Sequence, residues 1–185
     1  LYEIGKQLLS KNGYHEIGMD HFALESDSLY KASQSNKLHR NFMGYSASKT
    51  QLMIGLGVSS ISDSWYSFAQ NTKTLEDYYQ LLEWDKLPIV KGHILDDEDL
   101  IIRKHILNLT CEFETSWSNE ALYFKEIPSV LIDLKEIEND QLIMIEENRI
   151  KITEAGRPFV RNICMAFDLH LKRKSPETSL FSMTV

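Results

Sequence analysis

Cysteines are scarce in this sequence, and long apolar runs are absent. Only Cys111 and Cys164 occur in its 185 residues, too few for an iron–sulfur cluster, which needs three or four ligands. Each lies in an apolar helical pattern, which favours buried thiols in a reducing compartment over a disulfide or metal site. No run reaches about 18 apolar residues, and no basic-then-apolar segment opens the chain. We therefore expect neither a membrane span nor a signal peptide.

Basic residues are also in deficit. The chain has 20 Lys and Arg residues against 27 Asp and Glu residues, which gives a net charge of -7. Non-specific nucleic-acid binders and anionic-membrane binders need clustered Lys and Arg. The balance therefore predicts no nucleic-acid or membrane partner, and it favours a cytoplasmic enzyme or binding protein. The hydrophobic content of 43% is normal for a globular core.

The first segment has the order helix, turn, strand and polar cluster. Residues 1–8 have helical apolar spacing without a cap, so we expect the chain to be cut from a longer protein. The helix should end near Gly13, and residues 14–19 read as a strand that runs into Asp20 and His21. This order is typical of one unit of an α/β barrel, where ligands lie past the carboxyl ends of strands.

The middle of the chain predicts surface and core helices. Residues 25–37 are polar and Ser-rich, which indicates a short surface helix or loop. Apolar residues then recur at the i, i+3, i+4 and i+7 positions of a packed helix, namely Leu75, Tyr78, Tyr79 and Leu82.

A second domain is predicted to begin near residue 93, giving domains 1–92 and 93–185. The acidic run 96–99 precedes an apolar helical face, which indicates a helix start rather than a metal site. Residues 127–137 read as a helix, 142–145 and 149–152 as a β-hairpin, and Thr153 as the cap of a long helix. The buried stripe of that last helix should be Val160, Ile163, Phe167 and Leu171. Together these elements predict a mostly helical, winged-helix-like module.

A winged helix raises the alternative of a nucleic-acid-binding module. Basic residues do cluster on or after the last helix, namely Arg157, Arg161, Lys172, Arg173 and Lys174. However, the segment that would be the recognition helix, VLIDLKEIEND (130–140), is acidic, and phosphate would repel it. This alternative is therefore disfavoured.

One segment, HRNFMGYSASKTQLMIGLGVSSISD (39–63), combines aromatic, basic and glycine residues. Its GLGVSS run suggests a nucleotide-phosphate loop, but the preceding strand is meagre, Asp63 comes too early, and no Walker-type Lys follows. The two glycines instead permit close approach of the backbone to a flat ligand or to another strand.

Two histidines have charged neighbours at expected loop positions. His21 follows Asp20, and His39 precedes Arg40. A histidine beside an ionised group can be tuned toward proton transfer near neutral pH, so both are catalytic candidates. The other four histidines are read as surface or hydrogen-bonded residues.

Several runs of the sequence resemble the oxygen-independent coproporphyrinogen III oxidase family of radical S-adenosylmethionine enzymes. The resemblance spans nearly the whole chain and rests on GYHEIGMDHFAL, LHRNFMGYSASKT, QLMIGLGVSSIS and ITEAGRPFVRNICMAFDLHL. It implies an α+β chain: the last part of an incomplete α/β radical-SAM barrel, followed by the winged-helix-like domain. It also implies a partner, the N-terminal barrel of the same protein, with a CxxxCxxC loop that binds a [4Fe-4S] cluster.

The implied reaction uses S-adenosylmethionine and the cluster to convert two propionates of a tetrapyrrole substrate into vinyl groups in haem biosynthesis. By resemblance, Ile61 and Phe42 are cofactor contacts. Met43 occupies the position of a family glutamine, so a polar contact there is in doubt. Candidates for neighbours of the substrate carboxylates are His21, His39 and Arg40, the last because Arg pairs with carboxylates through two hydrogen bonds.

A haem chaperone of the same superfamily is the alternative reading. That branch has SNFA-type and HNxxYW-type sequences where this chain has MDHFA and HRNFMGY, which favours the oxidase. Because the chain lacks cluster cysteines, we expect it to be inactive by itself.

Overall fold

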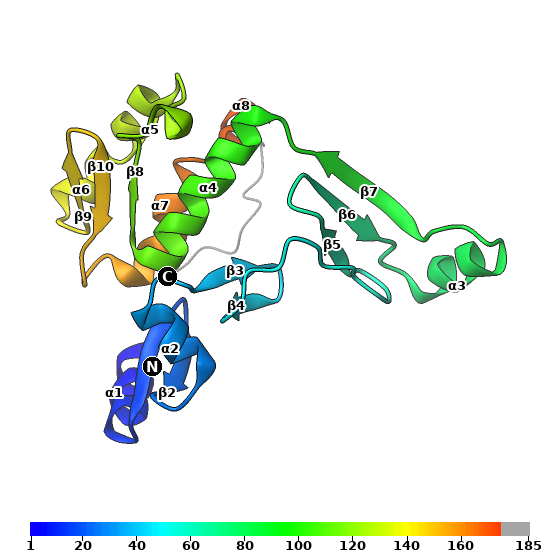
Figure 1. The fold of residues 1–185 in the computed structure, drawn as a ribbon, viewed down its shortest axis with the longest axis horizontal. Helices are drawn as coiled ribbons and strands as arrows, with labels where there is room; N and C mark the ends of the chain where they lie inside the picture. Colours follow the sequence, from blue (N-terminus) through cyan, green and yellow to red (C-terminus); the bar gives the residue numbers. More distant parts are fainter. Residues whose placement is uncertain (175–185) are drawn as a thin grey trace. The chain divides into compact units, whose positions relative to one another are not determined.

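The computed structural model describes residues 1–174, which form two compact units (Figure 1). Unit 1 comprises Leu1–Leu100 and unit 2 begins at Ile101. Their boundary lies inside helix α4 (Asp97–Glu112), whereas the sequence placed a domain boundary near residue 93. Both units mix helices and strands, which confirms the α+β class. No helix in the described part of the chain is long and apolar enough to cross a membrane.

Unit 1 opens with two helices and a hairpin, in the order α1 (Tyr2–Lys11), β1 (Tyr14–Gly18), β2 (His21–Leu24) and α2 (Ser28–Gln34). The predicted helix, strand and surface helix are thus confirmed. Gly13 has φ +79°, the left-handed conformation that ends helices. Asp27 caps α2, since its Oδ1 accepts a 2.7 Å hydrogen bond from the Leu29 amide.

The turn after β1 is tighter than the sequence indicated. Met19 and Asp20 both have positive φ, 45° and 68°, so the chain reverses at once and β2 pairs antiparallel with β1. His21 therefore opens a second strand instead of standing beyond a parallel one. Every strand pairing among residues 1–174 is antiparallel. The barrel interpretation of this unit stays a prediction.

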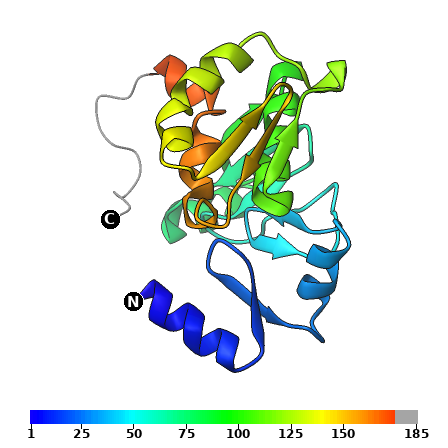
Figure 2. The same ribbon diagram turned by 90° about the vertical axis from the view of Figure 1, so that its left-hand side faces the viewer.

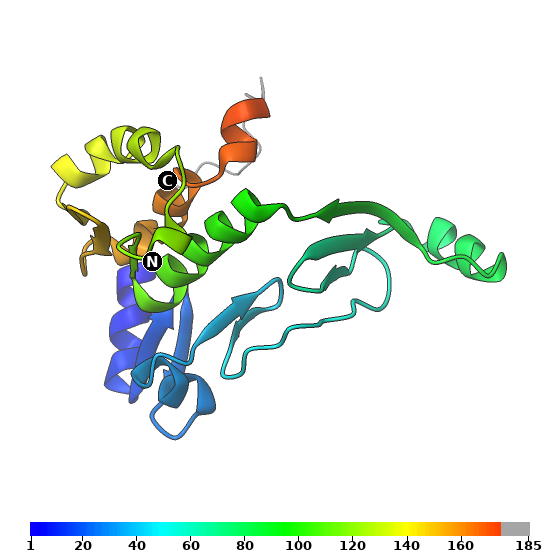
Figure 3. The same ribbon diagram turned by 45° about the horizontal axis from the view of Figure 1, so that its top comes forward.

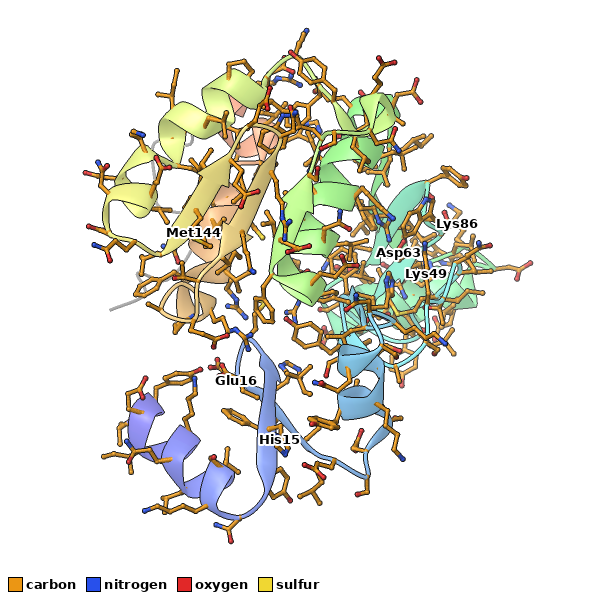
Figure 4. All side chains as sticks on the ribbon, turned by 60° about the vertical axis from the view of Figure 1, so that its left-hand side comes forward. His15, Glu16, Lys49, Asp63, Lys86 and Met144 are labelled. Atoms are coloured by element: carbon orange, nitrogen blue, oxygen red, sulfur yellow. The ribbon has the colours of Figure 1, made fainter. Side chains whose placement is uncertain are left out.

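One carboxylate holds α1 against β1. Glu16 accepts a 2.6 Å hydrogen bond from the Tyr2 hydroxyl and forms a 2.6 Å ion pair with Lys6 (Figure 4). Burial, followed by the hydrogen bond to Glu16, raises the pKa of the Tyr2 phenol. The first helix is thus attached to the hairpin by polar contacts, and none of its own residues is buried.

The rest of unit 1 is a small hairpin, a three-stranded sheet and one helix: β3 (His39–Asn41), β4 (Gly44–Ser46), β5 (Ile61–Asp63), β6 (Ser67–Asn71), α3 (Leu75–Glu83) and β7 (Ile89–Ile94). The sheet order is β5-β6-β7. Helix α3 connects β6 to β7 at one end of the strands (Figures 1 and 3). The predicted position of this helix is right, but its packing is wrong, because no residue of α3 is buried.

The GLGVSS segment forms a loop that is fastened to the sheet. The Asn71 side-chain amide donates to the backbone oxygens of Gly55 and Gly57, at 3.3 and 2.9 Å. The two glycine amides donate to the Ser62 Oγ, at 3.0 Å, and the Tyr78 hydroxyl, at 3.2 Å. A phosphate loop would need such amides to point at a ligand. Gly55 here allows the backbone to approach strand β5, one of the two possibilities that the sequence left open, whereas a Cβ on Gly57 would meet nothing within 4 Å.

Unit 2 surrounds a three-stranded sheet with order β8-β10-β9, seen in Figure 2. Its remaining elements are β8 (Glu114–Ser116), η1 (Glu120–Leu122), α5 (Ile127–Asp133), α6 (Lys135–Asn139), β9 (Ile143–Glu146), β10 (Arg149–Ile152), η2 (Arg157–Phe159), α7 (Val160–Met165) and α8 (Leu169–Lys174). The β9–β10 hairpin confirms the prediction, whereas β8 was missed. The predicted helix over 127–137 is two helices divided at Leu134.

The long helix predicted after Thr153 is wrong. The Thr153 hydroxyl accepts a 3.1 Å hydrogen bond from the Gly156 amide. This bond closes a turn, and no helix begins at Thr153. A Cβ on Gly156 would lie 1.9 Å from the Leu142 oxygen, so the chain presses against another backbone there. Three residues of the expected stripe are nevertheless buried, namely Val160 and Ile163 on α7 and Phe167 after it. The fourth, Leu171, lies on α8 and is only half-buried.

A histidine lies at the centre of the apolar core of unit 2. His105 is fully buried, and its ring stacks on Phe167 with centroids 5.3 Å apart. Its Nε2 is 2.8 Å from the Leu122 oxygen, and its Nδ1 is 2.7 Å from the Thr115 Oγ1. A carbonyl oxygen only accepts, so Nε2 carries the proton and Nδ1 accepts from the hydroxyl. Burial lowers the pKa of His105 below 6.5, against a smaller opposing effect of the Leu122 carbonyl.

Unit 2 is therefore expected to lose stability in acid. Because the folded state keeps His105 neutral, the unfolded state binds more protons once the pH falls below about 6.5. The free energy of unfolding should then fall by at most about 1.4 kcal/mol per pH unit. Urea unfolding followed by Trp117 fluorescence, with Trp65 and Trp84 changed to Phe, measures this. His105→Gln should flatten the dependence, and an unchanged slope in that variant would exclude His105 as its origin.

The close approach of Gly55 to β5 gives a matched pair of substitutions. A Cβ on Gly55 would lie 2.8 Å from the Ile61 carbonyl carbon, whereas a Cβ on Gly5 of α1 meets nothing within 4 Å. Gly55→Ala should displace the loop and cost about 1–3 kcal/mol. Gly5→Ala should stabilise its helix by about 0.5–1 kcal/mol. Hydrogen exchange at the Met53 and Asp63 amides, which bond across this loop, reports the difference; equal protection in both variants would refute close packing at Gly55.

Candidate functional site

The candidate site lies on one face of the β5-β6-β7 sheet in unit 1. Ile61 of β5 is paired with Gln70 of β6, which is in turn paired with Lys91 of β7. In the next row of the same face, Phe68 is paired with His93. Because side chains two residues apart share a face of a strand, all five point to the same side. The face therefore presents the aliphatic Ile61 at the β5 end of the first row and polar side chains at β7, and the second row begins with the buried carboxylate of Asp63 on β5.

A cavity of about 200 Å³ lies over this face. Its lining comprises Phe42, Ile61, Phe68, Ala69, Gln70, Lys91, Gly92 and His93. Phe42, from the turn between β3 and β4, meets Phe68 edge to face with ring centroids 5.1 Å apart. The structure thus brings together Phe42 and Ile61, the two cofactor contacts that the resemblance implied.

Met43, the third residue of that set, does not share this cavity. Its side chain is 85% exposed, and its backbone amide donates a 2.9 Å hydrogen bond to Asn41 Oδ1 in the β3–β4 turn. Successive residues of a tight turn project in different directions, so Phe42 lines the cavity while Met43 does not.

Arg40 lies on β3, two residues before Phe42. Its guanidinium carbon is 4.8 Å from the centroid of the Tyr45 ring, the residue paired with it on β4. Its Nη1 is buried and has no hydrogen-bond partner among the described residues. A buried guanidinium nitrogen without an acceptor is unfavourable, so this atom is suited to an anionic ligand.

The two histidine candidates lie near the same hairpin. His21 forms a T-shaped contact with Tyr45, at 5.1 Å, and its Nδ1 is 2.9 Å from the Met19 oxygen. His39 is buried, and its ring centroid is 6.5 Å from that of Trp65. Lys49 lies over the same Trp65 ring at 4.4 Å and is labelled in Figure 4. Neither histidine lines the cavity, so the structure separates them from Phe42 and Ile61.

The polar wall of the cavity was missed by the sequence analysis. Gln70, Lys91 and His93 lie on strands too short for their alternation to stand out. His93 is held by Asp99, with 2.8 Å between Nε2 and Oδ2. Asp99 is buried at the start of α4, where its amide donates a 2.9 Å hydrogen bond to Asp96 Oδ1. The acidic run therefore starts a helix, as predicted, and also fixes a cavity residue.

Three of the five basic residues that the nucleic-acid alternative named are paired with carboxylates in the described part of unit 2. Arg157 pairs with Glu154 at 2.7 Å, Lys172 pairs with Asp133, and Arg173 lies 3.6 Å from Glu126. These carboxylates lower the positive charge that Arg157, Lys172 and Arg173 would offer to phosphate. Cys111 is half-buried and Cys164 is buried, and neither forms a disulfide with a described residue.

Comparisons with known proteins agree with the resemblance seen in the sequence. No protein-family model matches the chain. Oxygen-independent coproporphyrinogen III oxidase of Escherichia coli is 38% identical over 175 residues, which is 90% of this chain. The enzyme of the same name from Synechocystis is 37% identical over 186 residues and 96% of this chain. This chain spans only 38% and 40% of the lengths of those two relatives.

A solved structure is similar as well. It is that of coproporphyrinogen III oxidase (HemN) from Escherichia coli, described as a radical SAM enzyme, with a TM-score of 0.84 and 35% sequence identity. The match covers 92% of this chain and 40% of the HemN chain. The chain is thus homologous, over about nine tenths of its length, to one part of the oxygen-independent coproporphyrinogen III oxidases.

Proposed function

We propose that this chain is the C-terminal portion of an oxygen-independent coproporphyrinogen III oxidase. The whole enzyme would convert two propionates of coproporphyrinogen III into vinyl groups by oxidative decarboxylation, which yields protoporphyrinogen IX in haem biosynthesis. The observation that carries this proposal is the shared cavity of Phe42 and Ile61, in a chain homologous to enzymes of that name.

S-adenosylmethionine fits the apolar part of this cavity. Phe42 and Phe68 offer aromatic surfaces and Ile61 an aliphatic one, a combination suited to a flat purine. The volume of about 200 Å³ is below the roughly 300–1,000 Å³ of a site that encloses a whole ligand. The cavity would therefore enclose only part of the cofactor. Together with a reduced [4Fe-4S] cluster, the bound cofactor would supply radical chemistry at a propionate of the substrate.

The residues of this chain would bind and orient rather than generate the radical. Phe42 and Ile61 would keep water from the apolar end of the cofactor, and Arg40 would hold a carboxylate through its unpartnered Nη1. Cys111 and Cys164 are too few for a cluster. The cluster would therefore be held elsewhere in the protein, and the 185-residue chain alone would not catalyse the reaction.

The missing partner of unit 1 would be the N-terminal barrel of the same protein. Few apolar side chains of this unit are buried, with Ile17, Ala23 and Ala32 among them. Many large ones are exposed, for example Leu56 at 85% and Leu87 at 77%. Exposed apolar surface of this extent is typical of an interaction surface. We infer that the barrel covers part of it. The comparisons do not favour a haem chaperone or a nucleic-acid-binding module.

Adjacent residues of the β3–β4 turn test the cofactor contact. In the full-length protein, Phe42→Ala should weaken S-adenosylmethionine binding by up to about tenfold, because aromatic contacts contribute roughly 0.5–1.5 kcal/mol beyond buried area. Met43→Ala, next to it but outside the cavity, is the control and should leave affinity unchanged. Equilibrium binding under anaerobic conditions measures both. Equal effects of the two substitutions would argue against the cavity as the cofactor site.

Arg40 gives a test of carboxylate recognition. In the full-length enzyme, Arg40→Ala should reduce kcat/KM for coproporphyrinogen III by about tenfold or more, because hydrogen bonds to charged groups contribute about 1.5–3 kcal/mol. Arg40→Lys keeps the charge but loses the planar donor pair, so it should recover only part of the activity. Unchanged turnover and affinity in Arg40→Ala would remove Arg40 from the site.

A further inference from the structure

The polar end of the cavity has no role in the function proposed above. The register places Lys91 of β7 directly opposite Gln70, in the row that begins with Ile61. All three side chains line the cavity. One row across the sheet therefore passes from an aliphatic side chain through an amide to an ammonium group.

The charges around this end favour an anion. Lys91 forms no ion pair with any residue between positions 1 and 174. The buried carboxylate of Asp99 accepts bonds from His93, at 2.8 Å, and from the Asp96 amide, at 3.2 Å. The Gln70 amide donates to the Ser59 oxygen at 3.3 Å, which fixes its side chain beside Lys91. The cation thus lines the cavity without a carboxylate of its own.

We propose that Lys91 recognises a carboxylate on a ligand whose apolar part lies against Phe42, Phe68 and Ile61. The inference rests on the proposed function, which offers two carboxylates of this kind. One is the methionyl carboxylate of S-adenosylmethionine, and the other is a propionate of the tetrapyrrole. Both would place an apolar group beside the aromatic wall and a negative charge at β7.

A fragment probe tests the subsite without any catalytic readout. The full-length protein is titrated with 3-phenylpropionate and with 3-phenylpropionamide, which differ in charge but not in the aromatic ring. The wild type should prefer the acid, and Lys91→Gln should reduce that preference by up to about fivefold, the upper end for a solvent-exposed charge pair. Lys91→Arg should retain it. Lys73→Gln, an exposed lysine outside the cavity, is the matched control and should match the wild type.

Two further titrations identify the source of the carboxylate. If Lys91→Gln weakens S-adenosylmethionine alone, the subsite takes the methionyl carboxylate. If it weakens coproporphyrin III but not its tetramethyl ester, the subsite takes a propionate. Both results support the proposal.

The failure of this inference is distinct from the failure of the proposed function. A wild-type protein with no preference for the acid fragment, or a preference that survives in Lys91→Gln, overturns the subsite whatever else binds. A wild-type protein that prefers the acid, but binds neither S-adenosylmethionine nor coproporphyrin III, overturns the proposed function and leaves the carboxylate subsite standing.

Discussion

The antiparallel register of β5, β6 and β7 is the constraint on which the candidate site depends. It sets Ile61, Gln70 and Lys91 in one row and Phe68 beside His93 in the next. Because side chains alternate between the faces of a strand, a shift of one residue in β6 would move its cavity residues to the other face. Register thus decides whether there is a cavity with one apolar and one cationic end.

Polar contacts outside the cavity fix that register. Asp63 and Met53 exchange backbone hydrogen bonds of 2.9 and 2.7 Å, and Asn71 fastens the GLGVSS loop beside the end of β6. The loop resembles a phosphate-binding element in sequence, yet its glycine amides are occupied by side chains of the same unit. Its role is to hold β5 at the edge of the sheet, and so to place Ile61 in the cavity.

The two units differ in how they are stabilised. Unit 2 has an apolar core of side chains with no exposed surface, including Leu109, Ile150 and Phe167, around the neutral ring of His105. Unit 1 buries few apolar side chains and relies on hairpins, caps and contacts such as Tyr2–Glu16. This difference is consistent with a unit that completes its core against other parts of a longer protein. The candidate site lies on this unit, which has the smaller apolar core of the two.

Local signals in the sequence predicted local structure, and tertiary packing decided the rest. The α4 start, the β9–β10 hairpin and the buried stripe of Val160 to Phe167 follow from charge and spacing. The long helix after Thr153 failed because the backbone around Gly156 packs against Leu142, a contact that no periodicity reveals.

The candidate site was likewise predicted only in part from the sequence. The resemblance indicated Phe42 and Ile61, but the polar wall at Lys91 required a strand pairing between distant segments.

The direct test of the cavity as the cofactor site is methyl NMR of the full-length protein with ¹³C-labelled isoleucine. The account predicts that S-adenosylmethionine shifts the Ile61 methyl signal and gives nuclear Overhauser effects to adenine protons, while that of exposed Ile4 stays unchanged. A bound cofactor that leaves the Ile61 signal unmoved would contradict it.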